Sequence, residues 1–201
     1  MTYEDVLRQL SEGTQRIIGQ LWDAVERGAL TPADFDVLAR DVLVTATARG
    51  YDLGTLSVRA YVEAVTGQPY ALPATAPGPA SAHRLGRALA TIAASGQDSR
   101  MQLLRLAGAE PLRAAQRGQS AEIKRNPKVT GWTRGLESDA CELCVWWWRN
   151  GRVWQADWTM PDHTGCMCHQ VPAIGRGDNV QTERQAAKSR ARAQQKERQK
   201  A

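Results

Sequence analysis

The chain has 201 residues, which is enough for one or two domains with a buried core. Its 26 basic and 21 acidic side chains give a net charge of +5. Residues 1–175 hold equal numbers of basic and acidic groups, so the whole excess lies in residues 176–201. The net positive charge therefore belongs to a basic tail, which argues against a basic face on a folded domain.

The sequence leads us to expect neither a membrane protein nor a secreted protein. No stretch approaches the ~20 apolar residues that a membrane span needs. Residues 1–10 lack the basic and apolar regions of a secretory signal. We therefore expect synthesis in a cytoplasm, where thiols stay reduced and the four cysteines favour metal binding over disulfides.

The first part of the chain has apolar residues at helical spacing. A first amphipathic helix is expected over residues 2–28, with a threonine cap and a glycine stop. Thr31-Pro32 predicts the start of a second helix, which should end near Gly50. A third helix is expected over residues 53–65, and the apolar stripes of all three should form a core.

Prolines then interrupt the pattern over residues 68–80, which predicts an extended connector. Two more helices are expected after it, over residues 81–96 and 98–124. Pro111 should kink or restart the second of these, because proline cannot donate the helical hydrogen bond.

The pattern changes to that of β-structure after these helices. Residues 128–134 alternate β-branched and aromatic side chains, as strands do. A short turn or helix is expected over 138–143, and a second strand over 145–148. The Asn-Gly pair at 150–151 is a strong hairpin signal, and 153–154 would be the returning strand.

Three consecutive tryptophans occupy the second predicted strand. On a strand, Trp146 and Trp148 would share one face and Trp147 would lie on the other. We expect at least one of these faces to pack against Trp132 or Trp154. The alternative is that the indoles stack on single-stranded bases or sugars.

These patterns predict a mainly α fold with a small C-terminal α+β module that contains a β-hairpin and a zinc-knot-like Cys/His site. The predicted divisions are an N-terminal helical region, a proline-rich connector, a second helical region, a Cys/His β-rich module and a basic C-terminal tail, at residues 1–67, 68–80, 81–125, 126–175 and 176–201.

All four cysteines and two of the three histidines lie within residues 139–169. Cys-x2-Cys turns let two thiolates converge on one ion, and tetrahedral zinc takes four such donors. About forty residues with few aliphatic side chains gain folding free energy from a bound metal. The candidate metal ligands are Cys141, Cys144, His163, Cys166 and Cys168.

More donors are present than zinc requires, so alternatives remain. Cys166 and Cys168 would face the same side of an extended segment and could complete an all-cysteine site. Otherwise His163 and one of these two cysteines complete it. His169 would point away from Cys168 and is the least favoured ligand. Reduced thiols without metal, or a disulfide, are further alternatives.

A catalytic metal is not expected at these residues. It would require an open coordination position and a nearby general base. Glu142 and Asp162 are available, but no motif assigns either a role, so we predict no catalytic residues. Asp162-His163 does resemble the opening of HNH nucleases, although Asn179 stands alone where the later residues of that motif belong. The alternative function is therefore a zinc-dependent DNA-binding or HNH-nuclease-like accessory protein.

The tail, residues 176–201, has no apolar periodicity and could be a solvated helix or disordered. Its cations could neutralise DNA phosphates, or it could be only a solvated extension. The candidate nucleic-acid-binding residues are Arg184, Lys188, Arg190, Arg192, Lys196, Arg198 and Lys200.

Residues 134–144, a short hairpin, His163-Thr-Gly-Cys166-Met-Cys168 and Pro172 together resemble the C-terminal module of MuF-like minor head proteins of tailed phages, especially the short actinobacteriophage forms. The resemblance covers roughly residues 122–172, and the tryptophan run departs from the usual pattern.

This resemblance implies a minor capsid protein of the virion, made in the bacterial host cytoplasm and placed inside the capsid. It implies several copies per virion, which contact the portal or major capsid protein and assist head assembly and DNA packaging or release. Packaged double-stranded DNA is a further implied partner for the tail. Neither a membrane nor a small-molecule substrate is expected.

Overall fold

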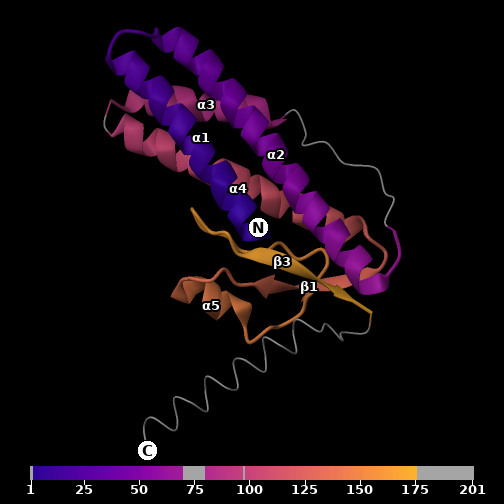
Figure 1. Ribbon diagram of the computed structural model, residues 1–201. Coiled ribbons are helices and arrows are strands. Elements are labelled where there is room, and N and C mark those ends of the chain that lie inside the picture. The colour runs from indigo at the N-terminus through magenta and orange to yellow at the C-terminus, as the bar shows by residue number, and fades with distance from the viewer. Residues whose placement is uncertain (1, 70–79, 97, 176–201) are drawn as a thin grey trace, which may run out of the picture. The chain divides into compact units, whose positions relative to one another are not determined.

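The computed structural model describes residues 2–69, 80–96 and 98–175 (Figure 1). Contacts divide these residues into two units. Unit 1 consists of the described parts of residues 1–57, 72–118 and 162–167. Unit 2 consists of the described parts of residues 58–71, 119–161 and 168–201. Among the described helices, none has an apolar stretch long enough to cross a membrane.

Unit 1 is built from helices. They are α1 (Tyr3–Glu26), the first part of α2 (Pro32–Thr66), α3 (Ala80–Ser95) and the first part of α4 (Ser99–Arg125). Helices α1 and α2 run side by side in opposite directions (Figure 1). All four helices contribute to one apolar core, which includes Ile18, Phe35, Leu43, Leu89 and Leu103.

The start of α1 confirms its predicted cap. Thr2 Oγ1 accepts the backbone N–H of Asp5 at 3.1 Å, and Asp5 Oδ2 accepts the backbone N–H of Thr2 at 2.7 Å. This capping box satisfies donors that have no partner within the helix. The hydrogen bond from the Thr2 backbone holds the pKa of Asp5 below its usual value.

The predicted helix break near Gly50 is wrong, because α2 continues through Gly50 and Gly54. Both glycines lie against the backbone of α4. A Cβ on Gly50 would overlap the carbonyl oxygen of Pro111, and one on Gly54 would overlap that of Ala115. The glycines therefore allow two helices to approach closely and do not end α2. Helix α4 likewise continues through Pro111 without a restart.

Unit 2 contains a three-stranded antiparallel sheet in the order β2-β1-β3. Its strands are β1 (Val129–Gly135), β2 (Trp154–Gln155) and β3 (His169–Ile174). The strand predicted over 128–134 is thus confirmed. Trp132 is fully buried in a core with Val58, Val62, Ile123 and Met160.

The second predicted strand is wrong, because residues 142–148 form the helix α5 (Glu142–Trp148). Arg149 and Asn150 follow it with φ of 50° and 56°, and Gly151 has a φ of 79°. The left-handed conformation at this turn ends a helix instead of closing a hairpin. The returning strand, β2, exists but pairs with β1.

The helical conformation of α5 also changes which tryptophans of the run are buried. Trp148 is 8% exposed and Trp146 is 57% exposed, so they do not share a face as predicted. The Trp147 ring lies 5.2 Å from the Arg134 guanidinium. Trp132 and Trp154 instead stack on each other, with ring centroids 6.1 Å apart. The packing of one face of the tryptophan run against either ring stays a prediction.

The fold is therefore mainly helical, with a small antiparallel sheet and a Cys/His cluster near the C-terminus, as predicted at that level. The connector falls largely on residues 70–79, and the tail begins at residue 176. Both stretches lie outside the described residues. The predicted divisions of the chain stay predictions.

Candidate metal centre

The Cys-x2-Cys pair lies at the beginning of α5. Cys141 is the N-cap residue, with extended backbone, and Cys144 lies in the first turn, where it is buried. Residues three apart at a helix start lie on neighbouring parts of one face, so both side chains can serve one site. The short helix thus replaces the loop that Cys-x2-Cys pairs often occupy.

The second half of the site is a tight turn followed by β3. The backbone N–H of Cys166 donates to the carbonyl oxygen of His163 at 3.1 Å. Gly165 has a φ of 84°, which favours glycine at this position of the turn. The carbonyl oxygen of Cys166 also accepts the Gln116 side-chain amide at 3.4 Å. Cys166 and Cys168 are both buried.

These two halves bring all five predicted ligands into two overlapping groups. Cys144, Cys166 and Cys168 form a fully buried group, and Cys141, Cys144 and His163 form the other. Within each group the candidate ligand atoms lie within 4.8 Å of one another. The cluster could hold a metal ion, with Cys144 common to both groups.

A buried arginine lies beside the shared cysteine. Arg134 of β1 is fully buried, and its guanidinium donates to Cys144 Sγ at 3.7 Å and to the carbonyl oxygen of Pro161. Positive charge near the sulfur stabilises the thiolate, which is the form that binds metal. The Cys168 thiol in turn donates to Glu137 Oε1 at 3.6 Å.

No protein-family model, curated protein or solved structure matches the chain. The interpretation of the site therefore depends on its own chemistry. Three buried sulfur atoms with an imidazole nearby form a soft donor set, which suits Zn²⁺ far better than Mg²⁺ or Ca²⁺.

Several residues considered from the sequence belong to neither of the two groups. Asp162 forms an ion pair with Arg113, with 3.5 Å between Oδ2 and Nε. Glu142 lies in the first turn of α5, where an acidic group favours the helix dipole. His169 pairs with Gly135 in the sheet, and burial lowers the pKa of its imidazole to about 4.

The tail residues named as nucleic-acid ligands, together with Asn179, lie outside the described residues. The sequence reasoning also missed two residues that contact the cysteines, Arg134 and Glu137. Arg134 had one signal, a charged side chain inside the pattern of a predicted strand, because a buried charge requires a partner. Glu137 follows that strand and had no comparable signal.

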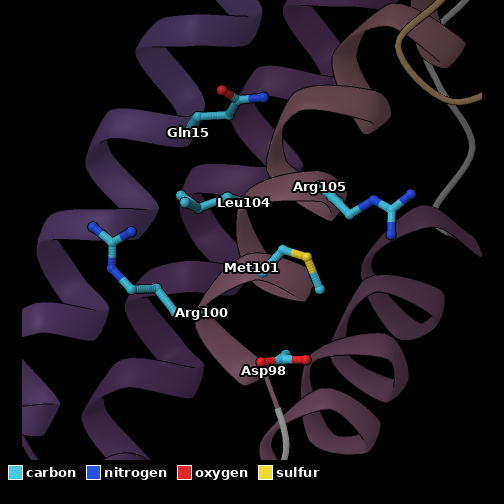
Figure 2. Close-up of a pocket in the computed structure, with 6 residues that line it drawn as sticks. All are labelled: Gln15, Asp98, Arg100, Met101, Leu104 and Arg105. Atoms are coloured by element: carbon cyan, nitrogen blue, oxygen red, sulfur yellow. The ribbon is translucent and has the colours of Figure 1, made fainter.

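A hollow of about 430 Å³ lies elsewhere, in unit 1, at the start of α4. Figure 2 shows Arg100 pointing from α4 toward α1, where its Nε donates to Asp23 Oδ1 at 2.9 Å. No thiol or imidazole is among the residues that line this hollow. It therefore offers no soft metal site comparable to the cysteine cluster.

Proposed function

We propose that residues 141–168 form a structural zinc site. The observation that carries this proposal is the close grouping of three buried sulfur atoms, those of Cys144, Cys166 and Cys168. These cysteines would supply three ligands, and Cys141 or His163 would supply the fourth. Tetrahedral coordination by thiolates is typical of structural zinc.

The role of this zinc would be to stabilise the fold. Its proposed ligands join the start of α5 to the turn that precedes β3. These segments are short, and binding an ion would supply the folding free energy that few apolar contacts provide. The ion would hold the four ligands and would not polarise a substrate, and we propose no enzymatic activity for the protein.

We infer further that this module belongs to a minor head protein inside the capsid of a tailed phage. The support is the resemblance of residues 134–172 to MuF-like proteins and the charge of the tail, residues 176–201. The protein would contact the portal or the major capsid protein. It would assist head assembly and DNA packaging or release, with the tail near packaged DNA.

Zinc analysis tests the first proposal. Full-length protein prepared without chelators should contain one zinc per chain by elemental mass spectrometry, because four protein donors saturate the ion. Cobalt substitution should give the visible spectrum of a tetrahedral thiolate site. Protein purified under reducing conditions that holds no stoichiometric metal would contradict the proposal.

Two single variants identify the fourth ligand in the same experiment. Cys141→Ser and His163→Asn each remove one candidate donor, and each leaves the buried group intact. The variant that loses cobalt thiolate absorption or metal affinity names the ligand. The other variant is its matched control and should bind metal as the unaltered chain does.

The virion proposal has a separate test. Mass spectrometry of purified virions, with and without external protease, should detect the chain in protected form, because the capsid shields its interior. Cross-linking should join it to the portal or the major capsid protein. Detection only in infected-cell lysate, and never in virions, would exclude the head-protein role while leaving the zinc proposal standing.

A further inference from the structure

The surface between α1 and α2 in unit 1 is a groove of about 770 Å³. Its lining comes from residues 6–17 of α1 and 41–56 of α2. Ile17 and Leu56 line it, and 45% and 57% of their surfaces are exposed. Exposed apolar side chains along two neighbouring helices suit the packing of a third helix.

Gly13 gives independent support for a close partner in this groove. It lies within α1, and a Cβ built on it meets nothing within 4 Å among the described residues. Glycine inside a helix costs about 1 kcal/mol relative to alanine. At Gly50 and Gly54 this cost is offset by close contact with α4. The described part of the chain offers no comparable contact at Gly13. A helix approaching from outside would supply one.

Three charged residues line the groove, Asp41, Arg49 and Asp52, and the first two indicate what that helix is. Asp41 and Arg49 both line the groove and are exposed, and neither has an ion pair within the described ranges. They lie at equal distances in sequence on either side of Thr45, which also lines the groove. In a twofold antiparallel pair of helices centred on Thr45, each Asp41 faces the partner's Arg49. Asp41 and Arg49 are therefore complementary to the same two residues of a second copy.

We propose that the α1–α2 groove is the interface of a homodimer, in which α2 of each copy packs against the groove of the other. Two symmetry-related pairs between Asp41 and Arg49 flank the axis at Thr45. The contact covers Ile17 and Leu56 and brings a helix over Gly13. This proposal is independent of the zinc site and of the virion role.

Charge reversal tests the pairing. Sedimentation velocity of the full chain over a concentration series should show a monomer–dimer equilibrium. Asp41→Arg and Arg49→Asp each place like charges opposite one another, and each should raise the dimer dissociation constant at least about tenfold. The double variant restores opposite charges with reversed sign and should dimerise nearly as the unaltered chain does.

Arg87→Asp is the matched control, because it makes the same charge change on an exposed residue of α3 outside this groove. It should leave dimerisation unchanged. Gly13→Trp should fill the groove and yield folded monomer, with circular dichroism to confirm the helices. A chain that is monomeric at every concentration, or a dimer that none of the reversals weakens, would overturn the proposal. Failure of the double variant to recover would overturn the twofold pairing.

Discussion

Removal of the proposed zinc by a chelator is expected to lower the thermal unfolding temperature of the chain by at least about 10 °C, since structural zinc contributes several kcal/mol. In this proposal the ion is the common partner of three buried sulfur atoms, and its removal leaves them without that partner. Six of the seven tryptophans lie in residues 132–158, so tryptophan fluorescence and near-ultraviolet circular dichroism should report the loss. Returning stoichiometric zinc should reverse it.

Cys168→Ser provides the variant for this experiment, because Cys168 is buried in the three-thiol group. Without chelator, this variant should already unfold at the lowered temperature expected for the metal-free chain. Adding chelator should change its unfolding temperature little. Asp139→Asn is the matched control: this exposed carboxyl lies beside the site in sequence but in neither ligand group. Equal unfolding temperatures with and without chelator in the unaltered chain would contradict a stabilising metal.

The helices were predictable where local chemistry determines their ends. Thr2 accepts a hydrogen bond from the first turn of α1, and such caps are visible in sequence. The role of Gly50 cannot be inferred from its neighbours in sequence. Its place in the middle of α2 depends on contact with Pro111 of α4, which is distant in sequence. A glycine can end a helix or let one approach another, and only tertiary structure distinguishes the two.

The secondary structure of the tryptophan run, residues 146–148, was also not predictable from local sequence. Alternation over four residues does not distinguish a strand from one turn of helix. In α5 the buried residues are Cys144 and Trp148, which are four apart, as on one face of a helix. Trp146, which was predicted to share a face with Trp148, then turns outward and is exposed, whereas Trp148 is buried.

The candidate site was more predictable than the fold around it. Cysteine and histidine spacing alone named five residues that the structure brings together. The contact of Arg134 with Cys144 was not predictable, because it depends on how β1 packs against α5. The candidate ligands are thus predictable from local spacing, whereas the charged residues around them depend on contacts between segments that are distant in sequence.

Gly54→Ala is expected to lower the free energy of unfolding by about 3 kcal/mol, the upper part of the range for overpacked cores. The added methyl group would overlap the carbonyl oxygen of Ala115. That oxygen belongs to the backbone of α4, so it cannot rotate away as a side chain would. Relief requires the two helices to separate within unit 1, which exposes apolar surface nearby. Urea unfolding followed by circular dichroism measures the change.

Gly86→Ala is the matched control, because it adds the same methyl group to a helix. Its Cβ would lie 3.6 Å from Arg40 Cδ, an ordinary contact with a flexible side chain. Helix propensity should then dominate and stabilise the chain by up to about 1 kcal/mol. A loss of stability for Gly54→Ala together with a gain for Gly86→Ala would show that the close approach of α2 to α4 requires glycine within α2. Equal stability of the two variants would mean that α2 and α4 do not approach so closely at Gly54.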